Sequence, residues 1–109
     1  MDTTRTLIMG HSGGGSTAPY VASEDDFYTA FAVLHGGLFV GGLGARRPRG
    51  WFSTGDQDPW RPPSSVEAAA LAARAVGFAT IEYRTFHAGH ELGPEELRAV
   101  LAWWLGHRE

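Results

Sequence analysis

The fold of this 109-residue chain is constrained most by one stretch, Thr6-Leu7-Ile8-Met9-Gly10-His11-Ser12-Gly13-Gly14-Gly15. Its first four residues are an apolar run that ends at a glycine, which is typical of a buried strand. The residues that follow fit G-x-S-x-G, and Ser16 to Ala22 can continue as a helix in which Pro19 is tolerated only near the start. The stretch therefore predicts a strand, a tight glycine-rich turn that lifts the Ser12 hydroxyl clear of a sheet, and a helix.

The glycines around Ser12 allow neighbouring backbone to approach without a clash at Cβ. The Gly13 N–H, next to the serine and pointing at the start of a helix, could donate to an oxyanion. The competing interpretation is a flexible turn, since the chain has 15 glycines and such a motif can arise by chance. The predicted strand before the motif and the predicted helix after it favour the structured turn.

Outward from this stretch, strand-like and helical segments alternate, which favours βα units around a parallel sheet. We predict an α/β fold with four parallel strands in sequential order, near residues 6–9, 31–34, 51–54 and 79–84. A glycine-rich loop covers residues 38–50. Because crossovers are right-handed, the helices after adjacent strands should cover one face of the sheet, and the last helix is expected on the other.

Two later helices carry clear end signals. Ser64 and Glu67 form a capping box at the start of one helix, and Gly77 is suited to its C-terminal end. Pro94 begins the last helix and Gly106 ends it. In that helix Leu97, Val100, Leu101, Trp104 and Leu105 recur at spacings of three and four, so they are predicted to form its buried stripe.

The composition excludes several function classes. Hydrophobic residues are 43% and charged residues 19% of the chain, and the net charge of −3 creates no positive field for nucleic acid. The chain has no cysteine, and all nine basic residues are arginines, so a thiol nucleophile, a disulfide framework, a Walker loop and a Schiff-base lysine are impossible. It has no run of 18 apolar residues and no apolar region near Met1, which predicts no membrane span and a cytoplasmic location.

The serine needs partners before it can act as a nucleophile. A hydroxyl is weak without a base, and the base needs an orienting acid. Asp56 and Asp58 follow the third predicted strand, and His90 follows the fourth. The carboxyl ends of parallel strands share one edge, so these residues can meet Ser12 there. The residues alone leave both aspartates open as the acid.

Four other histidines compete with His90 for the role of base. His11 is predicted to pack beside the turn, and His35, at the end of the second strand, to be a satisfied core histidine that could face the site. His107 should be exposed after the last helix. His87 and His90 form only a weak candidate metal pair, so we predict no metal and no other cofactor.

Three arginines gather in the loop, at positions 46, 47 and 49. Such a cluster is more often a solvated surface than a binding site. We therefore predict a solvated face, with recognition of an acidic substrate or partner as the alternative.

The motifs together resemble carboxylesterase and lipase-type α/β-hydrolases. The resemblance is carried by Gly10-His11-Ser12-Gly13-Gly14-Gly15, by Gly55-x-x-Asp58 with Pro62, and by Gly89-His90 before a helix rich in Leu and Trp. The chain is similar to the small esterases grouped with phospholipase/carboxylesterases, dienelactone hydrolases and polyhydroxybutyrate-depolymerase-like proteins. The resemblance covers nearly the whole chain but only the C-terminal half of that family, so residues 1–109 are predicted to be a single domain with a partial α/β-hydrolase fold.

The resemblance implies a serine hydrolase that cleaves a small-molecule carboxylic ester through an acyl-enzyme. Ser12 would be the nucleophile, Asp58 the acid, His90 the base and the Gly13 N–H an oxyanion donor. The family's second oxyanion donor follows its third strand, which has no counterpart here, and one such donor is worth about 3–4 kcal/mol. The alternative is a truncated or degenerate module that binds a ligand or partner without catalysis. Because the first strand would be a bare edge, we expect a homo-oligomer or pairing with a missing N-terminal half.

Overall fold

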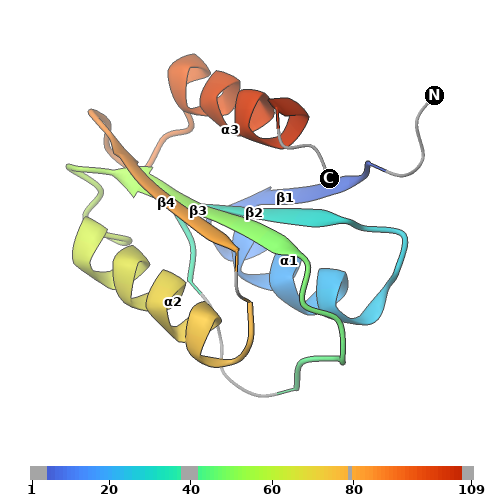
Figure 1. Cartoon of the computed structure of the whole chain (residues 1–109). Coiled ribbons are helices and arrows are strands. Elements are labelled where there is room, and N and C mark those ends of the chain that lie inside the picture. The colour runs from blue at the N-terminus through green and yellow to red at the C-terminus, as the bar shows by residue number, and fades with distance from the viewer. Residues whose placement is uncertain (1–4, 38–41, 79, 107–109) are drawn as a thin grey trace.

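A parallel sheet runs through the middle of the protein, with helices on both faces (Figure 1). The computed structural model describes residues 5–37, 42–78 and 80–106. Along the chain the elements are β1 (Leu7–His11), α1 (Gly13–Glu24), β2 (Ala30–Leu34), β3 (Arg49–Gly55), α2 (Pro63–Ala75), β4 (Ile81–Phe86) and α3 (Pro94–Gly106).

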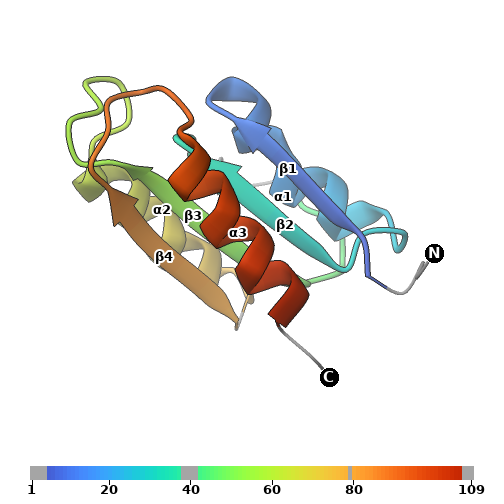
Figure 2. The same ribbon diagram turned by 90° about the horizontal axis from the view of Figure 1, so that it is seen from above.

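The four strands lie in the order β1-β2-β3-β4, and every neighbouring pair is parallel. This order confirms the predicted topology. Ala79, at the start of the predicted fourth strand, lies outside the described residues, and β4 runs from Ile81 to Phe86. All four strands point to the same edge of the sheet (Figure 2), so the segments that follow β1, β3 and β4 gather there.

Helices α1 and α2 cover one face of the sheet, and α3 covers the other, as predicted (Figure 1). Strand β2 is buried along its whole length because both of its faces are covered. Its alternate side chains serve different layers: Phe31 and Val33 belong to the core beneath α1 and α2, and Ala32 and Leu34 to the core beneath α3.

The core beneath α1 and α2 is built around three phenylalanines. The Phe31 ring packs edge-on against Phe52 and Phe78, with centroid separations of 5.8 Å and 5.2 Å. Small residues of the two helices, Ala18 and Ala73 among them, are completely buried against this aromatic cluster. Their short side chains allow the helices to pack closely on the sheet.

Two predicted helix starts are wrong. Helix α1 begins at Gly13, three residues earlier than expected, because Ser12 already accepts a backbone hydrogen bond from Ser16 at 3.2 Å. Pro19 therefore lies inside the helix. The predicted capping box of α2 is also absent, since Pro62 occupies the N-cap position and makes no side-chain cap.

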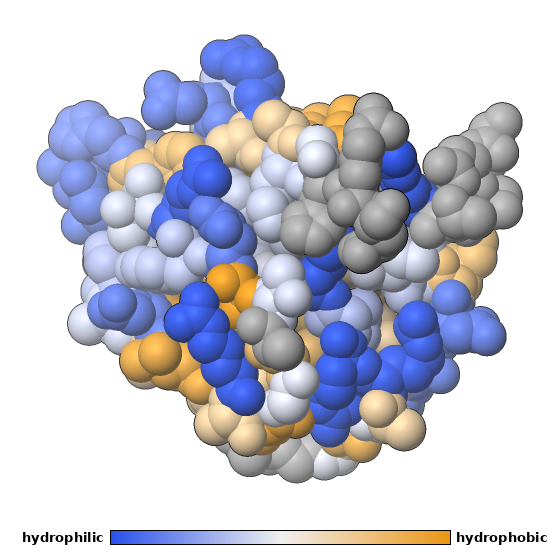
Figure 3. Space-filling view, in the orientation of Figure 1, coloured by the Kyte–Doolittle hydropathy of each residue, from blue (hydrophilic) through white to orange (hydrophobic). Residues whose placement is uncertain are grey.

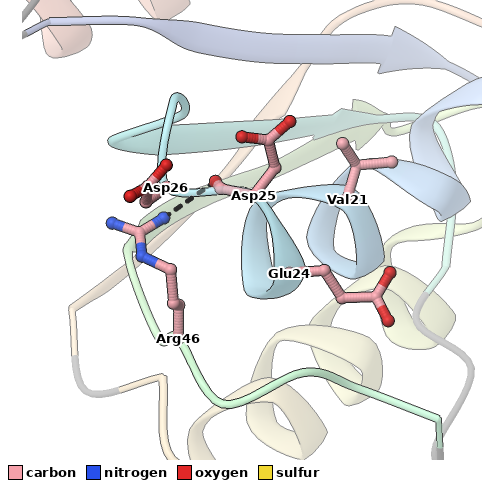
Figure 4. Close-up of a pocket in the computed structure, with 5 residues that line it drawn as sticks. All are labelled: Val21, Glu24, Asp25, Asp26 and Arg46. Carbon is pink, nitrogen blue, oxygen red and sulfur yellow. Dashed lines mark hydrogen bonds between the residues drawn. The ribbon is translucent and has the colours of Figure 1, made fainter.

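The arginine cluster of the predicted 38–50 loop is only partly solvated, which corrects the prediction for it: Arg46 and Arg49, the latter in β3, are half-buried, and Arg47 is exposed. Arg46 donates to the backbone oxygens of Ala22, Asp25 and Tyr28, at 3.3, 3.0 and 2.9 Å, near the C-terminal end of α1 (Figure 4). Carbonyls at a helix C-terminus lack partners within the helix, and a guanidinium can supply them. Arg47 and Arg49 donate to backbone oxygens at the ends of α2 and α3 in the same way. Residues 38–41 of the loop lie outside the described part.

Hydrophilic side chains and smaller hydrophobic areas are mixed on the face seen in Figure 3. The large apolar side chains with the greatest exposure include Trp60, Leu71 and Phe27, which come from different segments. None of the helices that the structure describes is long and apolar enough to span a bilayer.

Candidate active site

Ser12 makes the turn between β1 and α1 by itself. Its backbone has φ 59° and ψ −125°, in a region that non-glycine residues seldom adopt and that costs roughly 1–3 kcal/mol. The Ser12 N–H donates to the Leu34 carbonyl at 2.8 Å, which ties the turn to the end of β2. The hydroxyl is thereby held at the carboxyl edge of the sheet.

Glycines on both sides of the turn are required by close backbone contact. A Cβ on Gly10 would lie 2.5 Å from the carbonyl carbon of Gly14, and a Cβ on Gly15 would lie 2.6 Å from the Gly10 oxygen. Real Cβ atoms do not approach backbone so closely, so β1 and α1 can pack at this turn only with glycine at both positions.

The loops after β3 and β4 also touch through a glycine. A Cβ on Gly55 would overlap the Ala88 carbonyl oxygen. The Gln57 N–H donates to the same oxygen at 2.9 Å. This contact brings the loop that carries Asp58 against the loop that carries His90.

The three side chains selected from the sequence lie in hydrogen-bonding contact. Ser12 Oγ is 2.9 Å from His90 Nε2, and His90 Nδ1 is 2.7 Å from Asp58 Oδ2. The Asp58 side chain is fully buried, whereas that of His90 is 22% exposed. With Nδ1–H donating to the carboxylate, His90 Nε2 is free to accept the hydroxyl proton of Ser12.

Asp58 is held as a carboxylate by two backbone N–H groups and two histidines, and the Thr54 hydroxyl also lies 3.3 Å from its Oδ2. Its Oδ1 accepts the backbone N–H groups of Trp60 and Arg61, both at 2.9 Å, and its Oδ2 accepts from His90 and from His35. Burial alone would raise the pKa of Asp58, but these hydrogen bonds, that of the Arg61 N–H first among them, hold the pKa well below its usual range.

His11 and Asp56 take other roles. The His11 Nε2–H donates to the His90 backbone oxygen at 2.6 Å, and the two rings pack with centroids 5.0 Å apart. His11 therefore lies beside the turn, as predicted. Asp56 contacts His87 Nδ1 at 3.3 Å on the surface and does not reach His90. His107 lies outside the described residues.

His35 is a buried histidine with both ring nitrogens hydrogen-bonded. Its Nδ1 lies 2.8 Å from Asp58 Oδ2, and its Nε2 lies 2.7 Å from Glu96 Oε1. Burial alone would lower the pKa of His35, but the hydrogen bonds to Glu96 and then Asp58 outweigh it and raise the pKa above its ordinary value. The sequence predicted either a core histidine or one that faces the site, and His35 is both.

Glu96 was missed as a member of this site. A glutamate in the first turn of a helix, where Glu96 lies in α3, is usually explained by a favourable interaction with the helix dipole. In the structure it is buried together with Val100, four residues later, whereas Leu105 of the predicted stripe is 51% exposed. The inward face of α3 is thus rotated from the prediction. The spacing of four between Glu96 and Val100 was the signal that could have revealed it.

The group His35, Asp58 and His90 also has the composition of a metal site, with ligand atoms within 4.8 Å of one another. However, both imidazole Nδ1 atoms lie 2.7–2.8 Å from the same carboxylate oxygen. This spacing is that of hydrogen bonds, with a proton between each pair of atoms.

An open pocket of about 480 Å³ gives access to the serine and is lined by Ser12, Trp60, Arg61 and His90. Trp60 is 70% exposed, and the centroid of its ring lies 5.1 Å from the centroid of the His90 ring. A further hollow, lined by Val21, Glu24, Asp25, Asp26 and Arg46 (Figure 4), contains none of the residues predicted for the site.

Comparison with solved structures identifies the fold. SOBER1 of Arabidopsis thaliana matches with a TM-score of 0.80 and 20% identity over 97% of this chain and 54% of that one. Zea mays acyl-protein thioesterase 2 matches with a TM-score of 0.75 and 19% identity over 90% of this chain and 54% of that one. Esterase PE8 matches with a TM-score of 0.75 and 17% identity over 97% of this chain and 52% of that one.

The chain therefore has a partial α/β-hydrolase fold, as its motifs predicted, and it spans about half the length of the solved structures that it matches. No protein-family model matches the chain, and no curated protein matches it significantly.

Proposed function

We propose that this chain is the C-terminal half of a serine hydrolase that cleaves small-molecule carboxylic esters. The observation that carries the proposal is the unbroken line of hydrogen bonds from Ser12 Oγ through His90 to Asp58, at 2.9 Å and 2.7 Å. The strained backbone of Ser12 and the fold shared with esterases and an acyl-protein thioesterase support it. No resident cofactor takes part in the proposed reaction.

In the proposed reaction, Ser12 Oγ attacks the ester carbonyl carbon while its proton passes to His90 Nε2. The bond to the alcohol oxygen then breaks, that oxygen takes the proton from His90, and the acyl group stays on Ser12. Water attacks the acyl carbon and gives a proton to His90. The bond to Ser12 Oγ breaks, the acid leaves, and the proton returns to the serine. Asp58 orients His90 and stabilises its imidazolium throughout.

The Gly13 N–H is the proposed oxyanion donor, because it is the first amide of α1 and has no carbonyl one turn earlier in the helix. Hydrolases of this class use two such donors, and one is worth about 3–4 kcal/mol of transition-state stabilisation. We therefore expect weak hydrolysis of activated esters by this chain alone, with the second donor supplied by a partner.

Hydrolysis of p-nitrophenyl acetate by the wild-type protein and by Ser12→Ala tests the nucleophile. Ser12→Ala should remove the hydrolysis above background, because it removes the proposed nucleophile. The matched control is Ser64→Ala, because Ser64 is an exposed serine in the first turn of α2, outside the site. If hydrolysis survives Ser12→Ala unaltered, the nucleophile is a different residue.

The second candidate function is a non-catalytic module with a vestigial site. It is favoured by one observation, that the chain spans about half the length of the hydrolase structures it matches. A fluorophosphonate probe separates the two functions, because it reacts only with an activated serine.

We also propose that β1 pairs with a second copy or with an N-terminal half of the fold. It is the first strand of the sheet, and Met9 on it is 39% exposed. An edge strand offers unpaired backbone groups to another strand. Native mass measurement should show a dimer or a complex with a second chain, and a protein that stays monomeric at high concentration would contradict this proposal.

A cytoplasmic location likewise remains a prediction.

A further inference from the structure

Behind Asp58 lies a buried polar connection that the proposed reaction does not use. His35 is completely buried and Glu96 is 1% exposed. His35 joins Asp58 to Glu96, with contacts of 2.8 Å and 2.7 Å. Ionisable side chains are seldom buried unless they are paired, and here a whole pair is buried against the side chain that orients the base.

The hydrogen bonds around Glu96 limit where the protons can lie. The Trp51 Nε1–H donates to Ser53 Oγ at 2.7 Å, so the Ser53 hydroxyl is left to donate to Glu96 Oε2 at 2.6 Å. Glu96 Oε2 is therefore an acceptor, and in the ionised glutamate Oε1 also accepts, from the His35 Nε2–H. Each nitrogen of His35 then faces a carboxylate oxygen and must donate to it. The network assigns His35 two N–H groups and a positive charge.

The charged and titratable groups around His35 come from four places in the fold. They lie at the end of β1, in the loop after β3, in the loop after β4 and in the first turn of α3. The His11 and His90 rings have centroids 5.2 Å and 5.7 Å from that of His35. The groups that contact or pack beside His35 are His11, Asp58, His90 and Glu96, and the exposed carboxylate of Glu91 acts on it electrostatically from the surface.

We propose that His35, held as an imidazolium by Glu96, is a positioning residue that orients Asp58 Oδ2 toward His90 and offsets part of the negative charge that Asp58 presents to His90. This inference rests on the proposed function. A cation beside Asp58 favours the neutral form of His90, which is the form that accepts the Ser12 proton. Ser12 should therefore react at a lower pH than it would with Asp58 alone behind His90.

Glu96→Gln isolates the charge from the packing. The glutamine side chain has the same shape, can donate from its amide nitrogen to His35 Nε2 and can accept from Ser53 through its oxygen. The hydrogen-bonded frame is therefore kept while His35 becomes neutral. Glu95→Gln is the matched control, because Glu95 is the preceding residue of the same helix turn, carries the same charge and is exposed.

The first readout is the nitrogen-15 chemical shifts of the histidine rings, recorded at neutral pH. In the wild-type protein and in Glu95→Gln both nitrogens of His35 should carry protons. In Glu96→Gln the shifts of His35 should be those of a neutral ring protonated at Nδ1. A neutral His35 in the wild-type protein would overturn the proposal, and so would a doubly protonated His35 in Glu96→Gln.

The second readout is the pH dependence of Ser12 labelling by a fluorophosphonate probe, in which Oγ attacks phosphorus, fluoride leaves and His90 takes the proton. A charge 5.7 Å away in a partly buried site shifts a titration by about one to two pH units. Glu96→Gln also removes the more distant negative charge of Glu96, which offsets part of this effect. Half-maximal labelling should therefore move up by about half a pH unit to one pH unit in Glu96→Gln and stay in place in Glu95→Gln. If Glu96 served only to hold α3 in place, Glu96→Gln would lower the melting temperature and leave the pH of half-maximal labelling unchanged. That result would overturn the proposal.

A double variant, His35→Asn with Glu96→Gln, covers the case in which Glu96→Gln does not fold. Asparagine suits the backbone of His35, whose φ is 56°. The pair removes both charges, so it should show the same upward shift, and an unshifted midpoint overturns the proposal. Absence of labelling in the wild-type protein overturns the proposed function and the claim about pH, whereas the nitrogen shifts still decide the charge of His35.

Discussion

The two faces of the sheet are packed in different ways. The face covered by α1 and α2 is filled by apolar side chains, with the rings of Phe31, Phe52 and Phe78 in contact. The face covered by α3 has a smaller apolar cluster, and beside it lies a line of buried polar groups through Ser53, Glu96, His35 and Asp58. The same strands β2 and β3 supply both faces through alternate residues.

This difference suggests that one face of the sheet mainly stabilises the fold and the other mainly positions the groups proposed to react. Apolar burial stabilises a fold with little directional demand, so the α1 and α2 face can hold the sheet without fixing any one hydrogen bond. Buried polar groups need specific partners and therefore fix the angle of each side chain. Changes on the first face should lower the stability of the fold and leave the reactivity of Ser12 unchanged. Conservative changes on the second face should lower the reactivity of Ser12 with a smaller effect on stability.

The largest effect is expected for Asp58→Asn on the polar face. The amide nitrogen of the new side chain would face the Nδ1–H groups of His90 and His35, and two N–H groups cannot hydrogen-bond to each other. His90 would then lose the tautomer in which Nε2 accepts the proton of Ser12. Loss of a triad acid in this way reduces the rate on the order of 10⁴-fold. Fluorophosphonate labelling should therefore fall to background.

Asp56→Asn is the matched control for Asp58→Asn, since Asp56 lies two residues earlier in the same loop and is solvent-exposed. The Asp56→Asn variant should react with the fluorophosphonate probe at the wild-type rate. Equal labelling of the two variants would show that Asp58 does not serve as the acid.

On the apolar face, Phe52→Ala should lower the free energy of unfolding by about 3–5 kcal/mol, because it opens a cavity beneath α1 and α2. Urea denaturation followed by circular dichroism measures this loss. Phe27, which is 55% exposed, supplies the control, and its change to Ala should cost less than about 0.5 kcal/mol. The rate of Ser12 labelling per folded molecule should be the same in Phe52→Ala and Phe27→Ala. A large fall of this rate in Phe52→Ala would show that packing on the apolar face also controls the reactivity of Ser12.

A smaller effect is expected in the pH dependence of stability, and His35 and Asp58 of the polar face contribute to it. The raised pKa of His35 contributes stability below its ordinary value of about 6.5, and this contribution is lost as pH rises through the folded-state pKa. The lowered pKa of Asp58 contributes stability above about pH 4, which is lost as pH falls. Urea midpoints should therefore be highest between about pH 4 and 6.5.

Glu96→Gln sharpens this test, because it removes the charge that sustains the protonated form of His35. The fall in urea midpoint above pH 6.5 should become flatter in this variant, and the fall at acid pH should remain. An unchanged alkaline fall in Glu96→Gln would show that other groups cause it.

The sequence could predict the sheet order and most element bounds because these depend on local patterns, such as the apolar run of β2 and the Pro94 and Gly106 signals of α3. Ser12, Asp58 and His90 could be selected because a glycine-flanked serine and the chain order of its partners are visible without coordinates. Whether they act as proposed stays a prediction.

What sequence reasoning missed depends on distances across the fold. Glu96 lies 61 residues from His35 along the chain, and a glutamate in a first helical turn is usually explained by the helix dipole. The roles of Arg46, Arg47 and Arg49 were missed for the same reason, since the carbonyls they bind belong to other elements. The start of α1 was misplaced because the turn uses one residue, Ser12, where a longer glycine-rich turn was expected.

The central claim, that Ser12 is an activated nucleophile, is tested most directly by a fluorophosphonate probe with mass spectrometry of the labelled peptide. We expect one phosphonyl group per folded chain, located on Ser12, in the native protein, and no labelling of the protein when it is unfolded in urea. Native protein that stays unlabelled, or a label on any other serine, would contradict the claim.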